Sequence, residues 1–360
     1  MISFARGAPA PECLNVEELA DCARTALEQD GTSILSYGPG GGYGPLRERL
    51  AEQHGVEPGR VVITSGSLQG FAFLAERLVR PGTRVLVEAP TYDRPLKILA
   101  RHGAEVVGVP MDDDGLIPNE LPEGDFAFLY TIPTFQNPSG RTLSLERRRR
   151  LAELARERHL LVLEDDPYGL VRYDGDPLPS VFELAEGEQI AYCSSFSKTV
   201  APGLRVGWYV LPAQLAAEVE ALAVSTYISP PYLTQATVNE FLRRQTFLPN
   251  LERINGLLAA RRDAMLEALA RELPDDATWT RPDGGYFVWV DLPSGPPTAE
   301  LLVEAEGAGV TFVKGSDFFA GGRGGERALR LAFSFVSPGE IAEGVARLGR
   351  LVRAAAPAAL

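Results

Sequence analysis

The sequence predicts an α/β fold, with a mostly parallel seven-stranded sheet in a large domain and a smaller α+β domain behind it. The first observation is that short apolar runs alternate with helical patterns between about residues 43 and 245. The second is that most runs are apolar at consecutive positions, which is typical of strands covered by helices on both faces. The third is a change of pattern beyond about residue 246.

The seven apolar runs are each followed by polar or turn residues. They are predicted as strands over 61–66, 84–90, 104–110, 126–133, 160–166, 190–196 and 204–211. Segments between them, such as 67–80, 93–102 and 144–158, carry apolar residues at helical spacing with charges on the opposite face. Parallel sheets of this kind bind ligands at the carboxyl ends of their strands, so polar residues there are site candidates.

The change of pattern divides the chain into three parts. We expect residues 1–30 to associate with the small domain, 31–245 to form the large domain and 246–360 to form the small one. Within the last part the pattern predicts a long helix, three strands and a closing helix, over 250–273, 285–292, 310–314, 328–336 and 339–354.

Composition narrows the function classes. With 48 acidic against 35 basic residues, the net charge of −13 disfavours nucleic acid and anionic membrane surfaces as partners. The cysteines Cys13, Cys22 and Cys193 have no C-x-x-C spacing, which favours free thiols over a disulfide or zinc framework. No apolar run reaches about 20 residues and the start lacks a signal-peptide core, so we expect a cytoplasmic protein.

Common cofactor and metal motifs are absent. The glycine cluster GPGGGYG at 38–44 contains no G-x-G-x-x-G in any frame, and the sequence has neither G-x-x-x-x-G-K-[ST] nor H-E-x-x-H. The three histidines are scattered along the chain. Nicotinamide, nucleotide-hydrolysis and metal chemistry therefore lose support, and we expect no metal site.

Lysine is rare, so chemistry that needs an amine has three candidates, Lys97, Lys198 and Lys314. Lys198 follows the predicted strand 190–196 in the segment SSFSK. This position lies at the ligand-binding edge of the sheet rather than on a solvated helix face.

Other polar residues follow neighbouring strands. Asp165 and Tyr168 end strand 160–166 in the order D-D-P-Y, and Asn137 follows strand 126–133. Taken singly, each is equally well interpreted as a turn or helix-capping residue. The segment TSGSLQG at 64–70 joins a strand directly to a helix, so its amides could bind an anion at the helix N-terminus.

Four segments together resemble a known family: SYGPGGGYGPLR, PTFQNPSGRTLS, EDDPYG and SSFSKTVAPGLRVGW. The chain is similar to the fold-type I aminotransferases of class I/II, which depend on pyridoxal 5'-phosphate (PLP), and most resembles the branch of 2-aminoadipate and kynurenine aminotransferases. The similarity runs from SFARGAPAPE to the final helix. It implies PLP as cofactor and places it in the large domain.

The resemblance implies roles for residues around the PLP ring. Lys198 matches the Schiff-base lysine, and Asp165 matches the carboxylate that keeps the pyridine nitrogen protonated. Asn137 and Tyr168 match the residues that hydrogen-bond the phenolic oxygen. Tyr92, which ends the segment EAPTY, matches the aromatic residue that stacks on the ring, although it could be a plain wall residue.

The resemblance also implies contacts to the phosphate and the substrate. The phosphate would contact the Ser67 and Leu68 amides, the hydroxyls of Ser195 and Ser197, and Arg205. Tyr37 matches a tyrosine that reaches the phosphate of the neighbouring subunit, so a homodimer with shared sites is expected. Substrate binding would use Gly7, Asn137 and Arg330, with Arg330 gripping the α-carboxylate; a surface position is its alternative.

Arg6 departs from the family pattern, because relatives usually carry glycine at this position. A guanidinium here could pair with a distal carboxylate and favour glutamate or 2-aminoadipate as donor. The alternative is that Arg6 points to solvent or pairs with an acidic neighbour such as Glu12. The relatives also have an N-terminal arm before SFARG that touches the substrate, so the substrate preference is not carried over.

The implied activity is amino transfer from an amino acid to a 2-oxo acid such as 2-oxoglutarate, with ping-pong kinetics. A β-lyase or decarboxylase on the same scaffold stays open, because the cofactor site does not fix which Cα bond breaks. An aminotransferase-like regulatory or binding module is a further alternative. A regulator would need a basic helix-turn-helix segment, which this sequence does not contain.

Overall fold

A computed structural model describes residues 1–185 and 189–355 of the chain, and its largest element is an eight-stranded sheet. All seven predicted strands are present, and the two-residue β5 extends the edge by pairing with the end of β4. The strand order is β2-β9-β8-β7-β6-β3-β4-β5. The strands are β2 (Val61–Thr64), β3 (Arg84–Ala89), β4 (Glu105–Asp112), β5 (Gly115–Leu116), β6 (Leu129–Thr131), β7 (Val162–Asp165), β8 (Ile190–Ser195) and β9 (Gly207–Val210).

The centre of this sheet is parallel. Strands β8, β7, β6, β3 and β4 run in one direction, whereas β9 is antiparallel to both of its neighbours, β8 and β2. The carboxyl ends of β3, β6, β7 and β8 therefore meet at one edge. The segments that follow these strands carry most of the predicted site residues.

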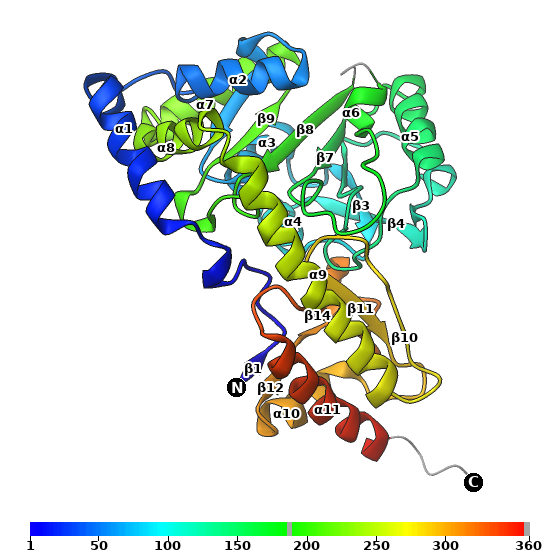
Figure 1. The fold of residues 1–360 in the computed structure, drawn as a ribbon. Helices are drawn as coiled ribbons and strands as arrows, with labels where there is room; N and C mark the ends of the chain where they lie inside the picture. Colours follow the sequence, from blue (N-terminus) through cyan, green and yellow to red (C-terminus); the bar gives the residue numbers. More distant parts are fainter. Residues whose placement is uncertain (186–188, 356–360) are drawn as a thin grey trace.

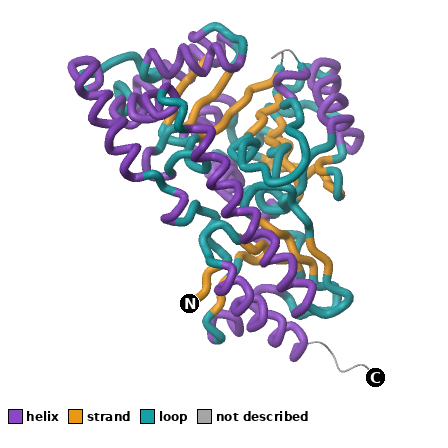
Figure 2. Tube along the Cα trace, viewed as in Figure 1, coloured by secondary structure: helices purple, strands orange, loops and turns teal. Residues whose placement is uncertain are grey.

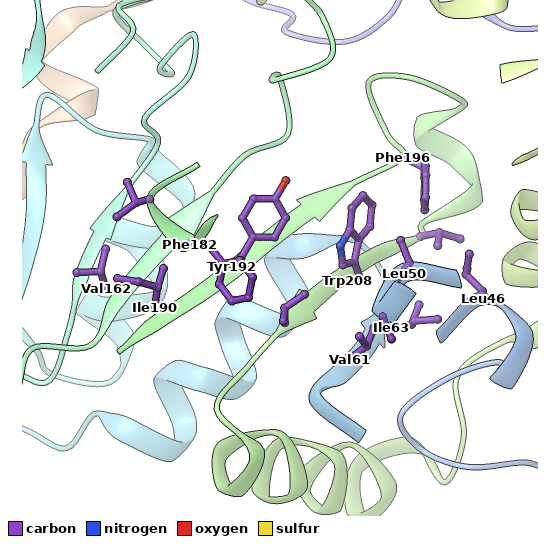
Figure 3. Packing of buried hydrophobic residues seen from close by; sticks show 14 of the residues in the cluster. Leu46, Leu50, Val61, Ile63, Val162, Phe182, Ile190, Tyr192, Phe196 and Trp208 are labelled. Carbon is purple, nitrogen blue, oxygen red and sulfur yellow. The ribbon is translucent and has the colours of Figure 1, made fainter. Parts of the chain in front are cut away.

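Alternation along the strands gives the sheet two apolar faces. Val61 and Ile63 of β2 belong to one core, and Val62 between them belongs to the other. The first core is shown in part in Figure 3, where Trp208 lies beside Phe196 with their ring centroids 4.7 Å apart. Its helices are α1 (Val16–Ile34), α2 (Gly44–His54), α5 (Leu145–Glu157), α6 (Val181–Leu184) and α8 (Tyr232–Arg243). The second core is covered by α3 (Ser67–Leu78), α4 (Asp93–Arg101) and α7 (Ala213–Tyr227).

A smaller α+β unit lies beside the sheet, and helix α9 runs from the large unit into it (Figure 1). Its antiparallel sheet has the order β10-β11-β14-β13. The predicted strand 310–314 is divided in two, because β12 pairs with β1 whereas β13 pairs with β14. The elements are α9 (Phe247–Glu272), β10 (Thr278–Trp279), β11 (Phe287–Asp291), α10 (Thr298–Gly307), β12 (Val310–Thr311), β13 (Val313–Lys314), β14 (Ala328–Ala332) and α11 (Pro338–Ala355).

The N-terminal segment contacts both units. Strand β1 (Ile2–Ser3) pairs with β12, and Phe4 lies in the core of the small unit. Helix α1, in contrast, packs against α8 of the large unit, as Figures 1 and 2 show. We therefore propose the division at 1–30, 31–245 and 246–360 with only the first few residues of the first part attached to the small unit; 356–360 lie outside the described residues.

Glycines let helix α3 approach the sheet closely. A Cβ at Gly70 would lie 2.1 Å from a ring atom of Tyr209 on β9, and one at Gly207 would lie 2.5 Å from the Ser67 amide nitrogen. The Tyr209 hydroxyl donates a hydrogen bond of 2.7 Å to the Ser67 carbonyl. Close approach thus fixes the start of α3 against the carboxyl edge of the sheet.

Among the described residues, no helix combines the length and the apolar character needed to cross a membrane. The three cysteines are free and buried. In the same part of the chain, no group of three or more His, Cys, Asp or Glu side chains is arranged to hold a metal ion.

The close packing of α3 predicts that a substitution at Gly70 is more harmful than one at a glycine with free space around it. Gly70→Ala should destabilise the protein by about 1–3 kcal/mol, since the new methyl group overlaps the Tyr209 ring. Gly256→Ala, in α9 where nothing lies within 4 Å of the added Cβ, should be neutral or stabilise by up to about 1 kcal/mol. Urea unfolding of both variants measures this, and equal stabilities would contradict the packing account.

Candidate active site

A cavity of about 340 Å³ lies at the carboxyl edge of the large sheet, between the two units. Every predicted site residue except Tyr37 lines it. These residues are Gly7, Ser67, Leu68, Tyr92, Asn137, Asp165, Tyr168, Ser195, Ser197, Lys198, Arg205 and Arg330. The cavity thus brings together four parts of the chain, namely the sheet edge, the start of α3, the N-terminal segment and β14.

Lys198 lies in the turn after β8 and is partly buried. Its Nζ donates a hydrogen bond of 2.8 Å to the Gly7 carbonyl, which belongs to the N-terminal segment. Burial lowers the pKa of Lys198 to about 8, and the positive charges of Arg330 and Arg205 act in the same direction. The amine is therefore neutral in a large fraction of molecules at mildly alkaline pH, as a nucleophile or a general base requires.

Asp165 ends β7 and faces the cavity as a buried carboxylate. Burial raises its pKa to about 6, against hydrogen bonds that lower it. The donors are Tyr130 on β6, at 2.7 Å, and Cys193 on β8, at 3.4 Å. At neutral pH the group is thus mostly an anion, and side chains from the two neighbouring strands hold it in the cavity lining.

Arg330 reaches the cavity from β14 and joins the two units. Its Nη1 donates to the Asn137 side-chain oxygen at 2.9 Å, and its Nη2 donates to the Ala5 carbonyl at 2.8 Å. The guanidinium also stacks on Phe287, 4.3 Å from the ring centroid. Its Nε is buried with no hydrogen-bond partner, and burial lowers the Arg330 pKa to about 10.

This guanidinium has no carboxylate partner among the residues that the structure describes. A buried and unpaired cation is costly unless an anion joins it. Arg330 is therefore suited to bind a carboxylate that enters the cavity, with further apolar support from Phe318 at 5.0 Å.

A second group of donors surrounds the start of α3. The Ser195 hydroxyl donates to the Ser197 hydroxyl at 2.8 Å, and Arg205 donates to the latter at 3.4 Å and to the Ser65 carbonyl at 3.1 Å. Gly66, at φ 77°, leaves space for Arg205, because an added Cβ would lie 2.0 Å from its Nη2. The first amides of α3 have no partner within the helix, so this group can accept a phosphate.

Two tyrosines enclose the space between these cations. Tyr168 is buried, and its ring packs on Tyr286 and Phe287 with centroids 5.5 and 5.9 Å apart. Tyr92, at the start of α4, also lines the cavity. Burial raises the pKa of Tyr92 to about 12, so its hydroxyl keeps its proton at neutral pH.

The structure does not place Arg6 where it could select acidic side chains, and its exposed position agrees with the alternative in which Arg6 points to solvent. Arg6 does not line the cavity; its guanidinium lies over the Phe335 ring, 4.0 Å from the centroid. Glu12, its proposed alternative partner, pairs with Arg261 instead. Stacking on Phe335 turns Arg6 away from the position of a substrate side chain.

Several residues that line the cavity or support its lining were not predicted. Asp93 and Arg94 follow Tyr92 at the mouth, with the Arg94 Nε 3.7 Å from the Asp93 carboxylate. A polar pair directly after an aromatic site residue was a usable signal for both. Tyr130 and Cys193 lie inside apolar strands, so only the register of the sheet reveals their contact with Asp165.

Comparison with known proteins agrees with this geometry. The pattern of the family "Aminotransferase class I and II" matches residues 2–348. The chain belongs to this family. A 2-aminoadipate transaminase of Thermus thermophilus is 38% identical over 98% of the chain and 90% of the relative. An aromatic-amino-acid aminotransferase of Thermococcus litoralis is 35% identical over 98% and 88%.

A solved structure shows the same fold. It is an alpha-aminoadipate aminotransferase from Thermus thermophilus in complex with N-(5'-phosphopyridoxyl)-L-leucine, with a TM-score of 0.93 and 38% identity over 98% of this chain and 92% of that one. Together with the family match, this similarity identifies the chain as an aminotransferase with PLP as its cofactor.

The described residues fit that cofactor. An amine of lowered pKa suits covalent attachment, a buried carboxylate suits a pyridinium proton, and the hydroxyl and guanidinium group beside α3 suits a phosphate. The orphaned Nε of Arg330 lies across the same cavity, where a substrate carboxylate can reach it.

The lowered pKa of Lys198 makes a direct prediction for the apoprotein. A lysine reacts through its neutral amine, so trace acetylation of Lys198 should rise with pH through about 8 and level off above it. Quantitative peptide mapping of the acetylated protein measures this. A rate that keeps rising beyond about pH 10, as for an unperturbed lysine, would contradict the electrostatic account.

Proposed function

We propose that this aminotransferase moves the amino group of an L-amino acid to a 2-oxo acid, 2-oxoglutarate among them, with both half-reactions in the one cavity. The observation that carries this proposal is the buried Arg330 guanidinium, which has no carboxylate partner in the described part of the chain and lies in the same cavity as Lys198. Amino and 2-oxo acids share the α-carboxylate that this cation would bind bidentately.

The predicted roles supply a complete set of contacts for PLP. Lys198 would attach it covalently, Asp165 would face the pyridine nitrogen, and Tyr92 would stack on the ring. The Asn137 amide, whose oxygen is engaged by Arg330, keeps its NH₂ to donate to the phenolic oxygen together with Tyr168. The phosphate would be bound by the Ser67 and Leu68 amides, Ser195, Ser197 and Arg205. Bound PLP supplies an electron sink for the electrons released at the substrate Cα.

The reaction then depends on one amine. The Nζ of Lys198, whose lowered pKa leaves a large fraction of it neutral at mildly alkaline pH, would take the proton from the substrate Cα and deliver it to the C4' carbon of bound PLP. The bond from Arg330 to the α-carboxylate orients the Cα toward this amine. Gly7, whose carbonyl accepts from Nζ, helps to fix the side chain at the cavity wall.

Covalent attachment can be tested by reduction and peptide mapping. The PLP-loaded protein should absorb as a yellow pigment, and borohydride should fix the pyridoxyl group on Lys198, because the other lysines lie outside the cavity. Lys97 and Lys314 pair with Asp93 and Asp317 respectively. A pyridoxyl label on either of them would contradict the assignment. Lys198→Ala should bind PLP only weakly and lose amino transfer.

Arg94 is a better candidate than Arg6 for selecting acidic side chains. It lines the cavity mouth and pairs with Asp93 at 3.7 Å, a distance that leaves the guanidinium able to bind a second carboxylate. The names of the relatives, which include 2-aminoadipate and aromatic amino acids, leave both acidic and neutral donors open.

Arg94→Ala should lower kcat/KM for glutamate and 2-aminoadipate by about 5- to 30-fold and leave leucine almost unchanged. The estimate discounts a charge-assisted bond to about 1–2 kcal/mol because the side chain is more than half exposed. Arg101→Ala, which removes a cation of the same helix outside the cavity, is the matched control. An equal loss on acidic and neutral donors would contradict the selective role.

A homodimer with shared sites is supported by an exposed apolar surface. Tyr37 is 82% exposed and Leu35 75% exposed, and the neighbouring segment packs on Val224 at the end of α7, near the exposed Ile228. Such a patch is typical of an interaction surface. From there Tyr37 would reach the phosphate site of the partner subunit.

Sedimentation at assay concentrations should therefore show a dimer. Tyr37→Phe should weaken PLP binding but leave the dimer intact. The phenyl ring keeps the apolar contact while the hydroxyl that would meet the phosphate is lost. A fully active monomer would contradict shared sites.

The proposed setting is the cytoplasm, with small molecules as the only substrates. The net charge of −13 disfavours nucleic acid and anionic membranes, and the free, buried cysteines suit a reducing compartment. Recovery of the native protein in the membrane fraction would argue against this location.

A further inference from the structure

The sheet register places three side chains around the end of β7. Asp165 is the direct register partner of Cys193 on β8, and Leu163, two residues earlier on the same face, is the partner of Tyr130 on β6. Side chains two residues apart on a strand share a face, so Tyr130, Asp165 and Cys193 face the same layer. This layer is the core beneath α3, α4 and α7.

Each oxygen of the Asp165 carboxylate has its own donor. The Tyr130 hydroxyl donates to Oδ2 at 2.7 Å, and the Cys193 thiol donates to Oδ1 at 3.4 Å. Tyr130 and Cys193 are each 1% exposed, so water does not compete for these bonds. The carboxylate is thereby clamped from both sides by the strands that flank β7.

The direction of proton sharing in these bonds follows from burial. Burial and the nearby negative charge hold the pKa of both Tyr130 and Cys193 well above their ordinary values, whereas the pKa of Asp165 is about 6. The protons therefore stay on the hydroxyl and the thiol, and the carboxylate is the acceptor in both bonds. Cys193 acts here as a hydrogen-bond donor and not as a nucleophile.

We propose that Tyr130 and Cys193 are positioning residues that fix the plane of the Asp165 carboxylate and stabilise it as the anion facing the pyridine nitrogen of PLP. This inference rests on the proposed role of Asp165. A carboxylate has about four lone-pair sites, so two donors leave sites for a pyridinium N–H. Neither residue touches the reacting atoms, and both act only through Asp165.

Other charged and titratable groups face Asp165 as well. Asp166 follows it on the chain and raises its pKa, whereas the positive charge of Lys198 lowers it. The remaining neighbours coupled to it by charge are Glu88, Tyr92, Tyr168 and Tyr209. Only Tyr130 and Cys193 donate side-chain hydrogen bonds to Asp165 among the described residues, so their removal has a distinct signature.

Loss of either donor should destabilise the anion. Tyr130→Phe is expected to lower kcat by roughly 10- to 100-fold, as for a bond to a charged group, and Cys193→Ala by roughly 3-fold, since a thiol is a weak donor. The acidic limb of the kcat–pH profile should move to higher pH in both variants, because Asp165 then protonates more readily. The pH titration of the absorbance of the PLP-loaded protein should shift as well, with KM nearly unchanged.

The test is a double-mutant cycle with Asp165→Asn. Residues that act through Asp165 lose their effect once the charge is absent, so Tyr130→Phe and Cys193→Ala should change kcat by less than about twofold in that background. A merely structural role would give the same factor in both backgrounds.

Two matched controls remove the same kinds of bond elsewhere. Tyr43→Phe deletes a hydroxyl that donates to Asp30 at 3.1 Å, and Cys22→Ala deletes a buried thiol 3.8 Å from Glu18. Both should leave the absorbance titration and the acidic limb unchanged. If they move these readouts as far as the site variants do, the proposal is overturned.

The outcomes separate this inference from the proposed function. If borohydride labels Lys198 and Asp165→Asn lowers kcat, but neither donor variant shifts the titration or couples to Asp165, the clamp is refuted and the function stands. If Asp165→Asn itself changes nothing, the assigned role of Asp165 fails first. Should Tyr130→Phe not fold, the Cys193→Ala cycle still decides the question.

Discussion

The hydrogen bond between Arg330 and Asn137 is the contact on which the site depends. It joins β14 of the small unit to the segment after β6 in the large one, at 2.9 Å and away from solvent. The same guanidinium holds the N-terminal segment through the Ala5 carbonyl. Three stretches of chain far apart in sequence thus meet at the sheet edge and line the cavity.

Burial then determines the chemistry of this cavity. Removal from water lowers the pKa of Lys198 and Arg330 and raises that of Asp165, since it disfavours each charged form. The positive charge of Arg330 also lowers the pKa of Lys198, which favours the neutral amine. An incoming carboxylate or phosphate offsets the cost of burying these positive charges. The cavity is therefore electrostatically complementary to an anionic cofactor and substrate.

Most of the named cavity residues could be predicted from the sequence, because parallel strands have their carboxyl ends at one edge of the sheet. Lys198 and Asn137 each follow a predicted strand and Asp165 lies at the end of one, so their convergence could be expected. The roles assigned to them came from the family resemblance rather than from spacing. The prediction of one continuous strand over 310–314 is wrong, because its two halves pair with different partners, β1 and β14. A local sequence pattern does not show such pairing.

Other features needed three dimensions. Arg6 was a reasonable candidate in sequence, yet stacking on Phe335 removes it from the cavity, whereas Arg94 at the start of α4 takes a place at the mouth. Tyr130 and Cys193 resemble ordinary core residues, and only the register of β6, β7 and β8 brings them to Asp165. Contacts across strands are long-range in sequence, so composition and periodicity carry no trace of them.

Isotope labelling of the transferred nitrogen atom distinguishes amino transfer from the alternative reactions. PLP-loaded protein is given a ¹⁵N-labelled L-amino acid and, after removal of excess donor, a 2-oxo acid. Amino transfer should yield one equivalent of the donor's 2-oxo acid and of pyridoxamine phosphate in the first step, and the ¹⁵N should appear in the new amino acid after the second. Release of labelled ammonia or of carbon dioxide, without labelled amino acid, would instead show a lyase or decarboxylase and contradict the account.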